Sequence, residues 1–186
     1  MVINMSIFNV IEKRRSIRSY LDENVNEDDL KKIVDTGKIA PIAGEFQITV
    51  VQNKDLIQKI NDVALDTMKN SGNEFLESRA AIPGYQPLYG APTLILLSAP
   101  EENIYGALTT SAAAENIILA ATALEYGTCY AITPTLPFIS PAGDEIAKEL
   151  GLPEGFKVLI GVLIGKADES EEIAERAELD NINYVK

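Results

Sequence analysis

The stretch TLILLSA, Thr93–Ala99, is a continuous apolar run near the middle of the chain. A run of this length without alternating polar positions is typical of a strand that is covered on both faces of its sheet. A second such run, VLIGVLI, occupies Val158–Ile164, and shorter β-rich runs occupy 48–51 and 129–133. Because helical patterns alternate with these runs after residue 48, the sequence predicts an α+β or α/β domain with a covered sheet.

Helical spacing of apolar residues accounts for the segments between these runs. The pattern from 104 to 126 is apolar on most sides and meets a natural stop at Gly127. As a helix it would be about 34 Å long, and it must be covered by the rest of the fold or by a second subunit. The other expected helices begin after Ser6, begin after Asn26, cover 56–64, and run from Ser140, with Pro141 in the first turn, to Leu150.

Residues 70–90 are rich in glycine and proline, with tyrosines at 85 and 89. Neither helical nor strand periodicity is visible there, so we expect a long irregular segment or a lid. Long irregular connections inside a domain usually serve a function.

The chain has 186 residues, a net charge of −12 and a pI near 4.4. The length fits one compact domain, and the acidity disfavours binding to nucleic acid or to anionic membranes, because the field of the protein repels phosphate. Glu115 interrupts the longest weakly polar stretch, which argues against a membrane span, and the N-terminus lacks the pattern of a secretory signal. We therefore expect a cytoplasmic protein with no nucleic-acid partner and no membrane partner.

The sequence has no histidine and a single cysteine, Cys129. These counts exclude Ser-His-Asp and Cys-His nucleophilic machinery, His-ligated zinc and an intrachain disulfide. The glycine patterns of Rossmann dinucleotide sites and of P-loops are also absent. We assign no catalytic residue and no metal ligand, and we expect a bound cofactor to supply the chemistry.

Four basic residues fall within the six positions 13–18, here called the basic segment: Lys13, Arg14, Arg15 and Arg18. Arginine suits bidentate binding of phosphate, and Ser16 adds a hydroxyl donor. The same residues also suit a solvated helix end, where cations interact favourably with the helix dipole. The local pattern leaves both interpretations open.

Six short blocks together cover nearly the whole chain: RRSIRSY at 14–20, APIAGEFQ at 40–47, YGAP at 89–92, AAEN at 113–116 with the following LAATALEYGTCYAI, GLPEG at 151–155, and the tail from Arg176 through Leu179 to Ile182. In this order they resemble the sequence blocks of the nitroreductase family of FMN flavoproteins.

This resemblance implies an α+β nitroreductase-like fold with a central, mostly antiparallel sheet flanked by helices. Residues 1–186 would form a single FMN-binding domain that assembles as an intertwined homodimer. Residues 168–186 would be a C-terminal extension that packs on the partner subunit. The FMN sites would lie at the dimer interface, which agrees with the need of the long apolar helix for a covering surface.

The resemblance also implies which residues hold FMN. Arg14, Arg15 and Ser16 would bind its phosphate and ribityl chain, Arg176 would complete the phosphate site, and Arg18 would lie near the N1–C2 edge of the flavin. From the other subunit would come Pro41, Ile42, Ala43 and Glu45, while Gln47 would help to orient the ring. Backbone amides around Ile132 and Thr133 would face flavin N5. Phe46, Tyr89 and Phe138 would line the substrate pocket, although aromatic residues of this kind are equally expected in a core.

The implied activity is that of an FMN-dependent oxidoreductase. Hydride would pass from NAD(P)H through flavin N5 to a small-molecule acceptor such as a nitroaromatic, a quinone or an enone, which requires no protein nucleophile. The chain departs from the family pattern at Ile42, Glu45 and Tyr130, and a carboxylate at position 45 would oppose formation of an anionic reduced flavin. The alternatives are an FMN-binding or sequestering module with little turnover, and a dimeric structural protein without cofactor.

Overall fold

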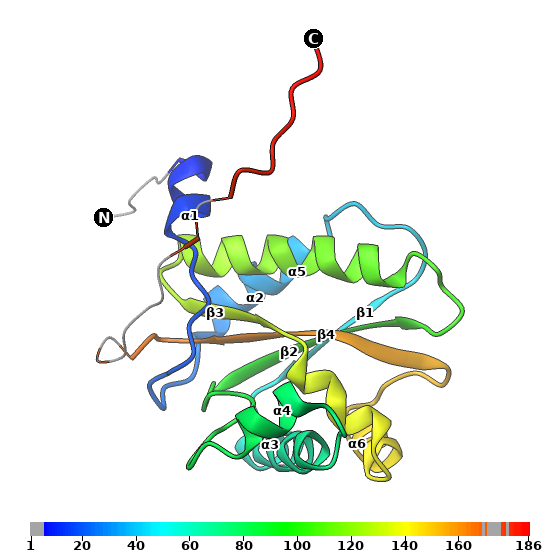
Figure 1. Ribbon diagram of the computed structural model, residues 1–186. Coiled ribbons are helices and arrows are strands. Elements are labelled where there is room, and N and C mark those ends of the chain that lie inside the picture. The colour runs from blue at the N-terminus through cyan, green and yellow to red at the C-terminus, as the bar shows by residue number, and fades with distance from the viewer. Residues whose placement is uncertain (1–5, 169, 171–175, 178) are drawn as a thin grey trace.

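Four antiparallel strands form the central sheet of the computed structural model, in the order β1-β2-β4-β3 (Figure 1). The structure describes residues 6–168, 170, 176, 177 and 179–186. The strands are β1, Gln47–Val51; β2, Thr93–Pro100; β3, Gly127–Ala131; and β4, Phe156–Gly165. This sheet confirms the expected antiparallel α+β architecture.

The two central strands explain the continuous apolar runs in the sequence. Leu94 through Leu97 in β2 and Val162 through Ile164 in β4 are fully buried. Alternate side chains of β2 point to opposite faces of the sheet, so one strand contributes to two hydrophobic cores: Leu94 and Leu96 enter one, and Ile95 and Leu97 enter the other.

Helices cover both faces of the sheet (Figure 1). On one face lie α2, Glu27–Gly37, and α5, Gly106–Ala123, while the other face carries α3, Lys54–Lys69; α4, Glu74–Ala80; α6, Gly143–Glu149; and the short 3-10 helix η1, Thr133–Ile139. The first helix, α1, Ile7–Lys13, and the C-terminal tail extend away from this three-layered body. Within the described part of the chain, none of the helices has the length and apolarity that crossing a membrane requires.

Two expected helix starts are confirmed by their caps. The Ser6 hydroxyl accepts a hydrogen bond from the backbone N–H of Asn9 at 3.3 Å, and the side chain of Asn26 accepts from two backbone N–H groups of α2. Such side-chain caps satisfy donors that have no partner inside the helix. The expected helix at 56–64 is also present, as the longer α3.

The expected helix at 104–126 is shorter, because α5 covers only Gly106–Ala123. Its end is set by Glu125, which adopts a left-handed φ of 66°, rather than by Gly127. The N–H of Tyr126 then donates to the carbonyl of Ala121 at 3.0 Å, which is the hydrogen-bond pattern of a Schellman cap.

The expected irregular character of 70–90 is wrong for 74–80, which form α4. Asn73 caps this helix and Glu74 and Glu77 lie in its first turn, a start signal that the surrounding glycines and prolines obscure. After α4, the buried amide of Asn61 holds the turn: its Nδ2 donates to Gln86 Oε1 at 2.6 Å and its Oδ1 accepts from the N–H of Leu88 at 3.1 Å. The role of this segment as a lid remains a prediction.

The helix expected from Ser140 begins three residues later, at Gly143. Ser140 does not cap it; its hydroxyl accepts from the N–H of Ala142 at 3.2 Å and donates to the carbonyl of Pro137. The preceding residues form η1 instead, and the two short helices pack tightly, since a Cβ on Gly143 would lie 2.9 Å from the Cα of Phe138. Likewise, the strand expected at 129–133 lies at 127–131, because η1 begins at Thr133.

Candidate functional site

The basic segment runs in extended form beside the edge strand β3. The backbone N–H of Ile17 donates to the carbonyl of Thr128 at 2.8 Å, and Ser16 forms a parallel bridge with Thr128. Side chains of an extended segment alternate between two sides. Arg14, Ser16 and Arg18 therefore share one side, and Arg15 lies on the other.

The side that carries Arg14, Ser16 and Arg18 faces Cys129. Burial raises the pKa of the Cys129 thiol, while the charges of Arg18 and Arg14 and a hydrogen bond from Ser16 partly oppose that rise. Cys129 is 3% exposed, so its thiol is protonated and packs against the core, as the sequence predicts.

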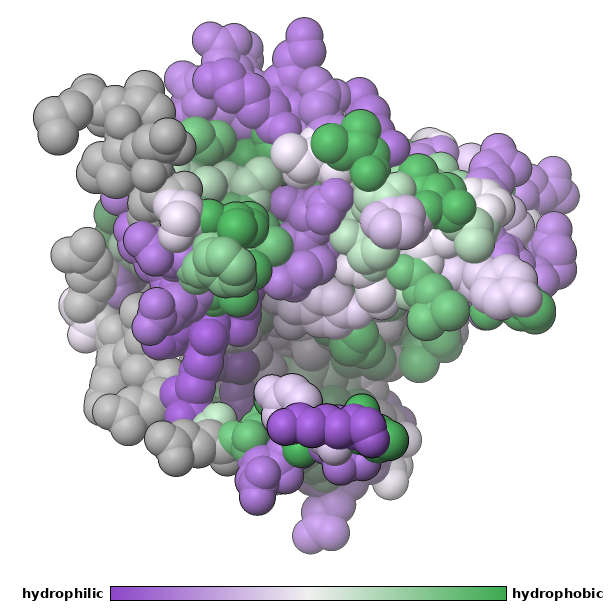
Figure 2. Space-filling model, turned by 90° about the horizontal axis from the view of Figure 1, so that it is seen from above, coloured by the Kyte–Doolittle hydropathy of each residue, from purple (hydrophilic) through white to green (hydrophobic). Residues whose placement is uncertain are grey.

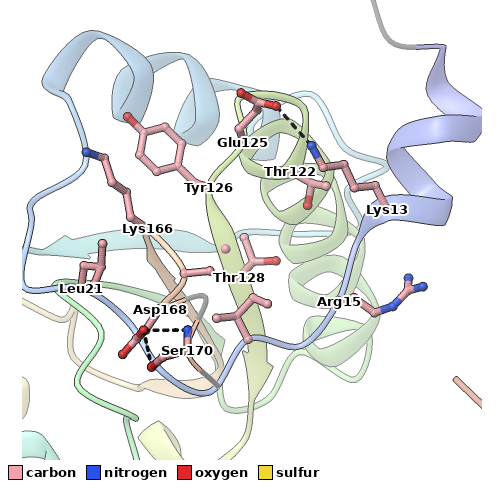
Figure 3. A pocket seen from close by; sticks show the side chains of 13 residues that line it. Lys13, Arg15, Leu21, Thr122, Glu125, Tyr126, Thr128, Lys166, Asp168 and Ser170 are labelled. Carbon is pink, nitrogen blue, oxygen red and sulfur yellow. Dashed lines mark hydrogen bonds and ion pairs between the residues drawn. The ribbon is translucent and has the colours of Figure 1, made fainter. Parts of the chain in front are cut away.

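The opposite side of the segment borders a cavity of about 740 Å³ (Figure 3). Arg15 and Lys13 lie at its border, but both are engaged: Arg15 Nη1 donates to the carbonyls of Glu12 and Arg14 at 2.5 and 3.0 Å, and Lys13 pairs with Glu125 at 3.2 Å. The sequence left two interpretations of the basic segment open, a phosphate site and a set of cations at a helix end. Arg15 fits the second, because its guanidinium lies at the C-terminal end of α1.

Arginines are concentrated around this segment and stay out of ion pairs. The chain has five arginines, and Arg79 is the only one outside residues 14–18 and 176. The side chain of Arg176 reaches back to the segment, where Nη2 donates to the carbonyl of Ile11 at 3.0 Å and to that of Arg14. Among the described residues, all seven ion pairs use a lysine, and none uses an arginine. In a chain of net charge −12, this leaves a local cationic surface whose donors are not consumed by the carboxylates that the structure describes.

The loop of Pro41, Ile42, Ala43 and Glu45 is exposed and lies elsewhere in the chain. It is fixed to the start of α5: the N–H of Ala43 donates to Thr109 Oγ1 at 3.0 Å, and its carbonyl accepts from Asn103 Nδ2 at 3.2 Å. Gly44 has a left-handed φ of 88°, and a Cβ there would lie 2.7 Å from Asn103 Nδ2. The hydrogen bonds of Ala43 and the close contact of the Gly44 backbone with the Asn103 side chain therefore fix the shape of the loop.

Within one chain this loop and the basic segment lie apart. The loop leads into β1, and the basic segment runs beside β3. These are the two edge strands of the sheet, roughly 14 Å apart across three strand spacings. Along α5, Thr109 contacts the loop and Thr122 borders the same cavity as Arg15, a separation of about 20 Å along a helix. A single chain thus does not bring together the two halves that the sequence assigns to one site.

Ile132 and Thr133 follow β3 directly and begin η1. Ile132 is 56% exposed, and no side chain caps the N-terminus of η1. Pro134 has no N–H and the N–H of Thr135 donates to the carbonyl of Ile132 at 2.9 Å, so the donors available at this point are the N–H groups of Ile132 and Thr133. The Thr133 hydroxyl donates to the carbonyl of Pro87 at 2.9 Å, which attaches the turn after α4 to this point. The amides therefore lie at an accessible corner beyond the edge strand.

The remaining expected residues divide between the two cores. Tyr89 and Phe138 are half-buried and pack on the core next to α3, whereas Phe46 packs on the core next to α5. Gln47 is half-buried in β1, where its Nε2 donates to Thr49 Oγ1 at 3.1 Å. Phe46 is thus separated from the other two aromatic residues within one chain.

Sequence reasoning missed three residues that shape this region. Asn61 fixes the turn after α4, Thr109 fixes the loop at Ala43, and Ser111 lies 3.2 Å from the hydroxyl of Tyr130. Their polar side chains on otherwise apolar helix faces were the available signal, but their partners lie far away in sequence.

Comparisons with known proteins all lead to one family. A family model described as the Nitroreductase family matches residues 11–166. Two crystal structures of nitroreductases with bound FMN share 26% sequence identity and cover 98% of this chain and 100% of their own: one from Bacteroides fragilis, with a TM-score of 0.89, and one from Desulfitobacterium hafniense, with a TM-score of 0.90. A protein from Archaeoglobus fulgidus named "Putative NADH dehydrogenase/NAD(P)H nitroreductase" is 26% identical over 184 residues, which are 95% of this chain and 94% of that protein.

Proposed function

The chain belongs to the nitroreductase family, and on that basis we propose that it is an FMN-dependent NAD(P)H oxidoreductase whose cofactor site is completed by two copies of the chain. The observation that carries the proposal is the side of the basic segment formed by Arg14, Ser16 and Arg18. It offers two guanidinium groups and a hydroxyl from one extended stretch of backbone, beside the exposed amides that follow β3.

Arg14 and Ser16 fit the phosphate end of FMN, and Arg18 fits the N1–C2 edge of its ring. Guanidinium groups bind phosphate through paired N–H donors, and Arg14 and Arg18 have no carboxylate partner among the described residues. Arg176 adds a third guanidinium next to Arg14. Arg15 makes a smaller contribution in this proposal, because it lies on the other side and donates to helix carbonyls.

Bound FMN would accept hydride from NAD(P)H at N5 and deliver it to a nitroaromatic, quinone or enone acceptor. The chain's own part is to bind, orient and shield. The backbone amides around Ile132 and Thr133 would hold N5, and Arg18 would place positive charge near the edge of the ring that gains electron density on reduction. Tyr89 and Phe138 would form one wall of the pocket.

The second half of the site would come from the loop Pro41, Ile42, Ala43 and Glu45 of a second copy, with Gln47 and Phe46 behind it. This requires a homodimer, and several exposed apolar side chains support one. On α1, Ile7, Phe8 and Ile11 are 56%, 77% and 45% exposed; Leu108 on α5 is 69% exposed; and on the tail Leu179, Ile182, Tyr184 and Val185 are all at least 68% exposed. Seen from the side of α1 and α5, apolar residues appear as separate green areas among hydrophilic ones (Figure 2).

A second copy of the chain would bury the apolar side chains that a single chain exposes to water. The tail, which extends away from the body (Figure 1), would pack on the partner subunit, as expected for the C-terminal extension. Residues 169, 171–175 and 178 of that extension lie outside the described residues.

The visible spectrum of the purified protein tests this proposal. Bound oxidised flavin would give the yellow absorbance, and anaerobic addition of NADH or NADPH would bleach it, with recovery of the colour when an acceptor such as a quinone is added. Colourless protein that ignores added FMN would refute the proposal. Yellow protein that resists both reductants would instead support a flavin-binding module with little turnover.

A further inference from the structure

A cluster of one arginine and two tyrosines lies between α4 and β2. The guanidinium carbon of Arg79 lies 5.1 Å from the centroid of the Tyr85 ring. The rings of Tyr85 and Tyr89 meet edge to face, with centroids 6.1 Å apart and an interplanar angle of 82°. The aromatic ring attracts the guanidinium and holds it in place, and hydrogen bonds to Tyr85 and Tyr89 fix it further.

This cluster is fixed next to Ile132 and Thr133, the residues whose amides would face flavin N5. The turn between Tyr85 and Tyr89 is bound to Thr133 through the carbonyl of Pro87 at 2.9 Å and to Asn61 through the N–H of Leu88. Tyr89 has a left-handed φ of 54°, which costs energy in a residue with a side chain and is maintained by its surroundings. The half-buried Tyr89 ring packs on the same core as Cys129, the residue that faces Arg14 and Arg18.

Arg79 has no carboxylate partner among the described residues. Glu77, two residues earlier in α4, accepts from the N–H of Gly72 at 2.9 Å instead. Burial raises the pKa of the Tyr85 hydroxyl, so this group stays protonated and can donate. The cluster therefore presents a fixed cation and a neutral phenol donor, which together suit an anionic group.

We propose that Arg79, positioned by Tyr85 and Tyr89, binds an anionic group, a carboxylate or a phosphate, on the small molecule that exchanges electrons at this site. The inference rests on the proposed function, because it needs a flavin at the corner of Thr133. The anion could belong to the acceptor or to the ribose phosphate of NADPH. The first source predicts a preference for anionic over neutral acceptors, and the second predicts a preference for NADPH over NADH.

The test compares charge preference in Arg79→Gln, Arg79→Lys and the control Lys31→Gln, which removes one positive charge from α2 on the other face of the sheet. Each variant is assayed with para-nitrobenzoate against the neutral para-nitrobenzamide, and with NADPH against NADH. Because hydrogen bonds to charged groups are strong, we expect Arg79→Gln to lower kcat/KM about tenfold or more for the anionic member of one pair only. Arg79→Lys would retain part of the preference, since it keeps the charge without the planar fork.

A fall for para-nitrobenzoate alone would place the acceptor's anion at Arg79, and a fall for NADPH alone would place the donor's phosphate there. Equal losses for charged and neutral partners in both pairs, or no loss in either, would overturn the inference. Loss of bound flavin in Arg79→Gln would also overturn it, because Arg79 would then belong to the cofactor site. Wild-type protein without flavin would refute the proposed function itself, and the absorbance spectrum shows this before any variant is made.

Discussion

Removing Arg14 and Arg18 together should release FMN without disturbing the fold. Both guanidiniums lie on the side of the basic segment that faces Cys129, and neither forms an ion pair among the described residues. Each charge-assisted hydrogen bond to FMN, from Arg14 at the phosphate and from Arg18 at the N1–C2 edge of the ring, would contribute about 1.5–3 kcal/mol. The Arg14→Ala, Arg18→Ala variant therefore loses about 3–6 kcal/mol, which weakens flavin binding by roughly a hundredfold to ten-thousandfold.

Flavin content after purification and the Kd for added FMN, measured by quenching of flavin fluorescence, would report this loss. Arg15→Ala is the matched control, since it removes the same side chain from the same segment but from the other side. We expect it to weaken FMN binding much less than the double change does. Sedimentation should show the same oligomeric state for all three proteins. Flavin retention in the double variant equal to that of the wild type, or an equal loss in Arg15→Ala, would refute this assignment of the phosphate site.

Three further outcomes follow from contacts described above. Asn61→Ala should lower the free energy of unfolding by about 1–3 kcal/mol in urea titrations, because it leaves buried backbone and amide groups without partners; an unchanged midpoint would contradict this. The pKa values of Cys129 and Tyr20 are raised, in both cases chiefly by burial, from ordinary values of 9.0 and 10.0. The folded chain thus holds these protons longer than the unfolded chain, so stability is full below pH 9 and falls as the pH rises beyond it. In the double variant Cys129→Ala, Tyr20→Phe, the free energy of unfolding should fall less steeply as the pH rises above 9. Finally, Phe8→Glu should shift the proposed dimer toward monomer in ultracentrifugation, whereas Phe75→Glu, at a similarly exposed site on α4, should not; equal behaviour of the two would argue against α1 as part of the interface.

Strong local signals in the sequence predicted much of the fold. The runs at Thr93–Ala99 and Val158–Ile164 became the two buried central strands, because a side chain on either face of these strands meets a helix layer. The caps at Ser6 and Asn26 also followed from residue type alone. In each of these cases a few neighbouring residues contain the physical cause.

The errors arose where local signals are weak or obscured, or where a distant contact decides the outcome. The end of α5 depends on a left-handed Glu125, which residue propensity disfavours, and α4 is only seven residues long within a segment rich in glycine and proline. The side to which each arginine of the basic segment points depends on the bridge to Thr128, more than a hundred positions away. Spacing could predict the cluster of arginines, but only tertiary pairing separates Arg15 from Arg14 and Arg18.

The loop at Ala43 and the basic segment lie at opposite edges of the sheet, so a site built from both would make cofactor retention depend on assembly. If one flavin bridges the two chains, dissociation of the subunits removes half of every binding pocket. Dilution would then release colour from the protein, and excess FMN would hold the subunits together by mass action. Hybrid assemblies make the same point: a protomer damaged only in the basic segment and one damaged only in the loop would together rebuild a single intact pocket, although neither homodimer has one.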